Sequence, residues 1–272
     1  MTHTLAVGDG PSLPVIVREI PGEDLRDAIS PYGYPGGSGE PADPAEVDWS
    51  GAGLVSLFVR DRIGDAGTLA GGTVRSEVQI ADPAAESGVR KRLREQIRRN
   101  ERRGWSVEAV PGPEAGEPSR GAFERAYGET MRRTEATERY LYPSEYFAEL
   151  LGSDRSWLLL ASNPEPLAGA IAVASDGFLH YYLGGTADDA LEDSPMKNLF
   201  AAMTSLAGEL GLSLNLGGGV SPGDSLEKFK QGFANATEPF RTHELICDPS
   251  AYDELTSAAG GGSEGFFPAY RA

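Results

Sequence analysis

The chain is poor in the residues that bind metals or form disulfides. Its 272 residues include one cysteine, Cys247, and three histidines. A lone cysteine excludes an internal disulfide and is typical of a protein kept in a reducing cytoplasm, where we expect this one. Structural zinc sites take four Cys or His ligands, so we expect no metal site. Cys247 ends an apolar stretch, which favours a buried strand over a catalytic thiol.

Long apolar runs and positive charge are also scarce. No stretch is apolar over the ~20 residues that a membrane-spanning helix needs. The first residues lack the basic segment and apolar run of a signal peptide. We therefore expect no membrane insertion. Lysine and arginine number 24 against 41 acidic residues, a net charge of −17, which argues against broad, non-specific binding to nucleic acid or anionic membranes.

One basic run stands against this acidic background. Residues 90–103 hold eight basic and two acidic residues, a net +6 in a chain of −17. Val89, Leu93 and Ile97 recur every four residues, which predicts a helix over 89–103 with one buried face. The arginines then cover the other faces. Such a run is either a solvated helix face or a phosphate-binding surface, and the sequence leaves both open.

A strand, a short acidic loop and a long helix follow one another in the second half. Residues 178–186 predict the strand, and apolar residues at three- and four-residue steps predict a helix over 195–210. Pro195 fits the first helical position, and Asp193 or Ser194 can cap the first amides. A helix N-terminus of this kind can bind an anion. A plain helix with a filled cap is the alternative.

The remaining elements predict an α/β protein with a mixed sheet and helices on both faces. Residues 1–12 read as frayed. The expected strands are 13–20, 53–60, 68–80, 105–110, 157–162, 167–174, 178–186, 212–216 and 241–247. The expected further helices are 119–134, 143–151, 224–231 and 249–255. A Pro/Gly/Glu stretch at 111–118 favours a boundary, giving a half at 1–112 that includes the basic helix, a second domain at 119–257 and a tail at 258–272.

Turn-forming residues surround two tyrosines at 30–39. Glycines there let a backbone approach a ligand closely, and Tyr32 and Tyr34 supply flat walls with hydroxyls. The loop is either a binding loop or a plain surface loop.

The order of elements in the second half resembles the GNAT acyltransferase fold. In that family the loop between the fourth strand and the next helix holds the pyrophosphate of the donor through backbone amides. Here that loop is 189–198, and it lacks the usual glycine-rich sequence with its arginine or glutamine.

A closer resemblance is to the Fem branch of that fold, the aminoacyl-tRNA-dependent transferases (FemABX-like) of peptidoglycan bridge formation and their relatives. Four stretches carry it and together span most of the chain. They are the tyrosine loop at 30–37, the arginine helix with its end at 98–105, the segments 127–133 and 140–147, and the glycines at 217–219 followed by 224–233. The Phe-Lys-x-x-Phe element at 229–233 is the most specific. The resemblance implies a truncated GNAT-like N-terminal half and a complete C-terminal one.

The resemblance also implies a reaction and a set of site residues. The reaction is amide formation, in which an acceptor amine attacks the ester carbonyl of an aminoacyl-tRNA, with no cofactor. Lys230 matches the family lysine at the reacting centre. The acceptor is a small-molecule or peptide amine, walled by Tyr32, Tyr34, Tyr140, Tyr142 and Tyr182. The residues expected to face the donor and its tRNA are Arg94, Arg98, Arg99, Arg102, Ser194 and Lys197.

Strand alternation adds one candidate to this set. It places His180 on one face with Tyr182 and opposite Tyr181, which makes His180 a candidate base or orienting group, or a structural histidine. Two other functions remain open: an N-acyltransferase that uses acyl-CoA, and a non-catalytic RNA or metabolite binder. The sequence leaves the oligomeric state undetermined.

Overall fold

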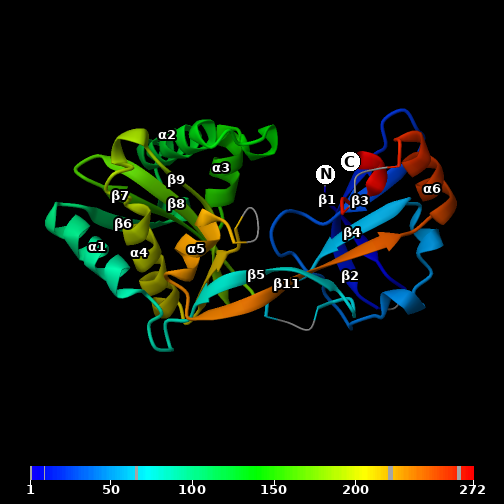
Figure 1. The fold of residues 1–272 in the computed structure, drawn as a ribbon, viewed down its shortest axis with the longest axis horizontal. Helices are drawn as coiled ribbons and strands as arrows, with labels where there is room; N and C mark the ends of the chain where they lie inside the picture. The colour runs from blue at the N-terminus through cyan, green and yellow to red at the C-terminus, as the bar shows by residue number, and fades with distance from the viewer. Residues whose placement is uncertain (1, 9, 65–66, 220–222, 262–264) are drawn as a thin grey trace. The chain divides into compact units, whose positions relative to one another are not determined.

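The computed structural model of the protein describes residues 2–8, 10–64, 67–219, 223–261 and 265–272 (Figure 1). The chain forms two compact units. Unit 1 consists of Met1–Glu77 and Glu238–Ala272, and unit 2 of Val78–Thr237. Strands β5 (Thr73–Ala81) and β11 (Ala236–Ile246) carry the chain from one unit to the other.

Unit 2 is built on a mixed sheet. An antiparallel meander runs through β6 (Ser106–Pro111), β7 (Ser156–Ser162), β8 (Pro166–Ser175) and β9 (Phe178–Thr186). β10 (Ser213–Gly217) then pairs parallel with β9 and antiparallel with the end of β5. The parallel pair needs a crossover, which the long helix supplies.

Helices cover both faces of this sheet (Figure 1). On one face lie α2 (Glu117–Arg133) and α3 (Ser144–Leu151), whose Phe123 and Phe147 share a core with Leu158. On the other lie α1 (Lys91–Arg102), α4 (Met196–Glu209) and α5 (Ser225–Gln231), where Phe200 is fully buried. The predicted α/β class, with a mixed sheet and helices on both faces, is confirmed.

Unit 1 has its own core. Its strands lie in the order β1 (Thr2–Ala6), β2 (Ser12–Glu19), β3 (Arg26–Ile29), β4 (Ser56–Arg60), β11, and α6 (Pro249–Ala258) follows β11. β1 and β3 were not expected. The first residues, predicted to fray, instead form β1, which pairs antiparallel with β2 over its whole length. Short 3-10 turns complete the elements: Pro44–Glu46, Trp49–Ala52, Gly112–Glu114, Glu138–Tyr140, Asp188–Ala190 and Ala269–Arg271.

The division into units does not coincide with the boundary predicted at 112–119. That Pro/Gly-rich stretch lies inside unit 2. A Cβ on Gly112 would lie 2.0 Å from the Ser156 hydroxyl and 2.5 Å from the Leu151 carbonyl, so the glycine serves close packing rather than a hinge. The basic helix α1 also belongs to unit 2, because Ile97 packs in the same core as Phe200.

Candidate functional site

Lys230 is a buried lysine in the last turn of α5. Its side chain is 6% exposed. Its ammonium donates to the Gly218 carbonyl at 2.7 Å and lies 5.6 Å from the centre of the Tyr181 ring. Burial lowers the pKa of Lys230 from 10.5 to about 8, and the Asp224 carboxylate opposes that fall. The site therefore holds a cation that is only weakly hydrated and can interact strongly with charge nearby.

This ammonium lies where two parallel strands stop pairing. The ladder between β9 and β10 ends at the pair His180–Asn215, although β9 continues to Thr186. Tyr181 is the next residue of β9, and Gly218 follows the end of β10. Lys230 thus contacts Tyr181 of β9 and Gly218, the residue after β10, just past the last residue pair of the two strands.

His180 faces away from Lys230. Its neighbours Leu179 and Tyr181 belong to the core under α4, so alternation turns His180 to the opposite face of the sheet. There its Nδ1 lies 2.9 Å from the Asn215 side-chain nitrogen and its Nε2 lies 3.1 Å from the Ser175 hydroxyl. The structure does not bring the two candidate catalytic residues, Lys230 and His180, together.

Hydrogen bonds assign the proton of His180. The Asn215 side-chain oxygen accepts the Gly217 amide at 2.7 Å, so its nitrogen must donate to Nδ1, and Nε2 carries the ring proton. Burial lowers the pKa of His180, with Ser175 and Asp176 opposing. This neutral ring ties β9 to β10, and its role as a base stays a prediction.

Asp193 does not cap α4. Its carboxylate accepts the Trp105 indole N–H at 3.0 Å and pairs with Arg103, both beyond the end of α1. Its backbone carbonyl accepts from Asn100 at 3.0 Å. Ser194 adopts a φ of 50°, and Pro195 occupies the N-cap position without a side-chain cap. Sequence reasoning missed this because the partners of Asp193 lie some ninety residues earlier in the chain.

Most backbone amides in the loop before α4 donate hydrogen bonds to other groups of the protein. The Thr186 amide donates to the Thr130 hydroxyl at 2.9 Å, and the Asp188 amide to the Glu129 carboxylate at 2.7 Å. The amides that donate within the chain are those of Thr186, Ala187, Asp188, Ala190, Leu191, Ser194, Lys197 and Asn198. A loop with most of its amides already engaged is a poor cradle for a pyrophosphate.

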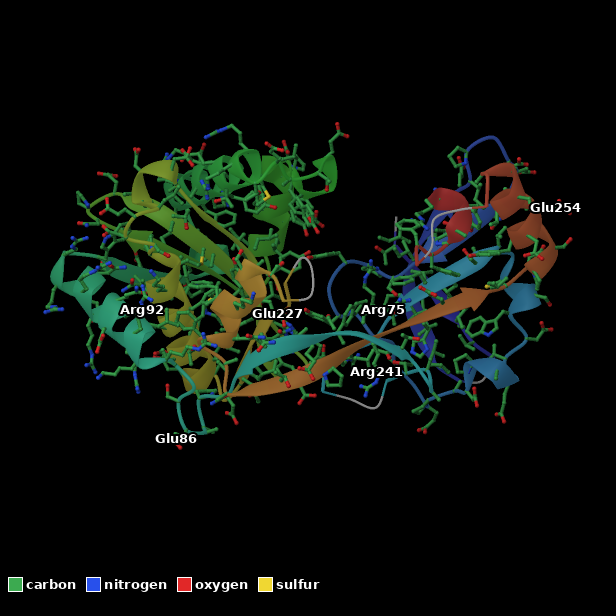
Figure 2. The ribbon with its side chains drawn as sticks, in the orientation of Figure 1. Arg75, Glu86, Arg92, Glu227, Arg241 and Glu254 are labelled. Carbon is green, nitrogen blue, oxygen red and sulfur yellow. The ribbon has the colours of Figure 1, made fainter. Side chains whose placement is uncertain are left out.

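The basic residues of α1 fall into two groups that have different neighbours. Arg92 and Arg99 act electrostatically on Lys197, whose pKa is lowered by burial first and then by these two arginines. Arg99 and Arg103 also act electrostatically on the Asp193 carboxylate, which precedes α4, and Figure 2 shows Arg92 on α1. Arg98 and Arg102 instead line a surface hollow with Glu95 and Glu101. Arg94 is exposed.

Two of the predicted acceptor tyrosines, Tyr142 and Tyr182, both contact Tyr146, which was not predicted. Tyr142 stacks on Tyr146 with ring centres 4.3 Å apart, and the Tyr146 and Tyr182 hydroxyls lie 2.6 Å apart. Tyr146 stands in the same Tyr-Pro-Ser-Glu-Tyr segment as Tyr142, at the four-residue helical spacing that could have indicated it. The Tyr140 carbonyl accepts from the Tyr127 hydroxyl at 2.8 Å.

Tyr32 and Tyr34 belong to unit 1. Tyr32 is 57% exposed, and Tyr34 packs edge-on against Phe240 at 5.2 Å. The loop that carries them is fastened to the segment after β4: the Gly37 amide donates to the Thr68 hydroxyl at 2.8 Å, and Arg62 donates to the Gly37 carbonyl at 3.0 Å.

Comparison with known proteins gives a family and a fold. Residues 87–231 match the family described as acetyltransferase (GNAT) domain. The structure is similar to that of FemX (TM-score 0.65, 12% identity, 93% of this chain and 90% of that one). It is also similar to L-PGS from Bacillus licheniformis (TM-score 0.62, 12% identity, 96% and 88%). The C-terminal domain of a putative lysylphosphatidylglycerol synthetase from Agrobacterium fabrum is another such structure (TM-score 0.61, 14% identity, 97% and 91%). No curated protein sequence matches the chain.

Proposed function

Because the chain belongs to the GNAT acyltransferase family, we propose that it moves an aminoacyl group from an aminoacyl-tRNA to the amine of a small-molecule or peptide acceptor. The observation that carries this proposal is the buried ammonium of Lys230 beside the end of the β9–β10 ladder. No helix in the described part of the chain is long and apolar enough to cross a membrane.

Lys230 has the chemistry that the reaction requires. The acceptor amine attacks the ester carbonyl, a C–N bond forms, and the bond to the tRNA ribose oxygen breaks. Negative charge develops on the carbonyl oxygen, and a weakly hydrated cation stabilises it more than bulk water does. The amine attacks in its neutral form, and the proton that it loses as the C–N bond forms passes through water or a base to the departing ribose oxygen. The family resemblance and the burial of Lys230 together support this role.

The donor surface favours tRNA over acyl-CoA. Most amides of the loop before α4 already donate within the chain, which leaves fewer of them for the pyrophosphate that the GNAT resemblance implies for acyl-CoA. The exposed arginines of α1 instead suit the repeated phosphates of a nucleic acid. Arg99 of α1 and Lys197 in the first turn of α4 would also hold phosphate. Tyr142 and Tyr182, joined through Tyr146, would wall the acceptor.

One experiment compares the two donors directly. The protein is incubated with labelled aminoacyl-tRNAs or labelled acetyl-CoA and a panel of amines, and the label on the amine product is measured. Transfer from aminoacyl-tRNA alone supports the proposal. If acetyl-CoA protects the fold from heat and donates its label while charged tRNA does neither, the chain is an acyl-CoA enzyme. Transfer from neither donor, with RNA bound, favours a non-catalytic binder.

Two lysines of α5 give a matched test of the reacting centre. Lys230→Ala should lower kcat by ~100-fold or more with little change in tRNA affinity, as the loss of an oxyanion-stabilising group does. Lys228 is exposed on the same helix, and Lys228→Ala should leave kcat unchanged. Equal rates for the two variants would remove Lys230 from the reacting centre.

A further inference from the structure

We infer that Asp224 is a positioning residue for Lys230: it keeps the ammonium charged and fixes the glycine turn whose carbonyl receives it. Its consequence for catalysis rests on the role proposed above for Lys230. The inference itself concerns one carboxylate, one ammonium and the turn at 217–219, all within unit 2.

Asp224 and the Lys230 ammonium lie at the same end of α5. Asp224 is the N-cap of the helix, and its Oδ1 accepts the Glu227 amide at 2.7 Å. Lys230 lies near the other end, but helical side chains lean toward the N-terminus. Its ammonium accordingly reaches Gly218, which precedes the helix. A helix N-terminus disfavours a cation, so a carboxylate placed there offsets both the dipole and the burial.

The glycine turn is held from two sides. On one side the Gly217 amide donates to Asn215, and Gly217 adopts a φ of 73°. On the other, a Cβ on Gly219 would lie 2.5 Å from Asp224 Oδ1, so the turn lies directly against the carboxylate and only glycine fits. The Gly218 carbonyl is thereby fixed 2.7 Å from the Lys230 ammonium.

Among the described residues, those that pack around Lys230 from the neighbouring elements are aromatic or apolar. Tyr181 on β9 presents its ring and is the titratable group there. Phe200 on α4 packs against Tyr181 and Phe229, and Leu93 on α1 packs at Gly232 after the helix. Within the described part of unit 2, Asp224 is the charge that acts on Lys230 and raises its pKa against the effect of burial.

Asp224→Asn separates the charge from the cap. Asn is as good an N-cap as Asp, so the helix and turn remain while the negative charge is lost. The pKa of Lys230 should then fall by about half a unit to one unit, the size of a partly screened charge pair. Asp224→Ser, which also caps, should give the same fall. Glu227→Gln removes the same charge from the same helix, where Figure 2 shows Glu227, and should leave Lys230 unchanged.

The pKa can be read directly by NMR. The chain contains four lysines, Lys91, Lys197, Lys228 and Lys230, so lysine labelled with ¹³C at Cε gives few signals, and Lys230→Met identifies the one from Lys230. The full chain and each variant are titrated from pH 6 to 11. If the Lys230 pKa is the same in the wild type and both Asp224 variants, the inference is overturned, whatever the activity.

The pH dependence of transfer supplies the second readout. Lys230 must be protonated to stabilise the carbonyl oxygen, so the alkaline limb of kcat/KM should lie near pH 8 and move down in Asp224→Asn. The acid limb, set by the acceptor amine, should stay in place. A shifted NMR titration in a protein that transfers nothing would leave Asp224 as the positioning residue and overturn the proposed function alone. A purely structural Asp224 would move neither limb.

Discussion

Lys230 is a buried amine that the fold holds at an energetic cost. Its folded pKa of about 8 lies below the value of 10.5 for an exposed lysine. Below pH 8 both folded and unfolded chains are protonated there, and the full cost of burying the charge is present. Between about pH 8 and 10.5 the unfolded chain binds more protons, so stability rises with pH. The gain over that window is about 3 kcal/mol.

The prediction is a difference between two variants measured at two pH values. Urea unfolding of the wild type and Lys230→Met at pH 7 and pH 10 should show the wild type gaining on the variant as the pH rises. Other groups that titrate in this window, such as Cys247, whose pKa burial raises to about 11, act equally in both proteins and cancel. Lys228→Met is the control. A wild type that gains nothing on Lys230→Met would mean that Lys230 is not buried as a cation.

At the scale of single residues, the sequence predicts positions better than partners. Alternation along 178–186 correctly places Tyr181 opposite His180, because two-residue periodicity is a local property. The Phe-Lys-x-x-Phe pattern leads to Lys230, which is buried as a site lysine would be. The partners of Asp193 could not be predicted from the sequence. A carboxylate before a helix usually caps that helix, and only the tertiary fold brings Trp105 and Arg103 to Asp193.

At the scale of the elements, the first prediction concerns tRNA binding by the exposed arginines of α1. Arg98 and Arg102 are exposed and line the same surface hollow. If they bind tRNA phosphate, replacing both by Gln should weaken charged-tRNA binding and reduce the slope of log K against log salt by about 1.4–1.8, the share of two phosphate contacts. Fluorescence anisotropy between 50 and 300 mM salt measures that slope.

The control removes the same charge from elsewhere in unit 2. Arg125 on α2 and Arg155 before β7 are also exposed, and Arg125→Gln with Arg155→Gln should leave the slope nearly unchanged. Equal losses in the two double variants would mean that only the net charge of the protein matters. An unaltered slope in the α1 variant would exclude this face of α1 from the tRNA contact.

The C-terminal segment makes a second prediction at this scale. It was predicted to be a tail, yet the Arg271 guanidinium pairs with Asp27, which is fully buried and also accepts from Arg18 and Tyr270. Arg271→Gln removes one of the two cations that Asp27 contacts and should lower the stability of unit 1 by about 1–3 kcal/mol. Arg26 is exposed on β3, so Arg26→Gln is the control, with both midpoints taken from urea unfolding. Equal midpoints would make the docked segment energetically neutral.

At the scale of the whole molecule, the sequence predicts the helices of unit 2 but not the division of the chain. Apolar periodicity marks α1, α2 and α4 because each buries one face within its own segment. The pairing of β4 with β11, from Arg60 with Thr242 to Ser56 with Ile246, joins segments that are remote in the sequence, and local patterns carry no information on it. β1 and β3 were not predicted for the same reason, because both are short and are defined by their pairing with neighbouring strands.

From the division into two units we predict that one fragment of the chain folds alone and another does not. The two cores of unit 2 consist entirely of residues between 78 and 237, so a fragment with these limits should fold alone. Its thermal unfolding should be cooperative by circular dichroism and by the fluorescence of Trp105 and Trp157. The core of unit 1 combines Leu57 and Val59 of β4 with Cys247 after β11. Residues 1–77 alone lose β11 and should stay unfolded until 238–272 is supplied as a second chain. A folded 1–77 fragment, or a 78–237 fragment without a cooperative transition, would show that the units are not the folding units of the protein.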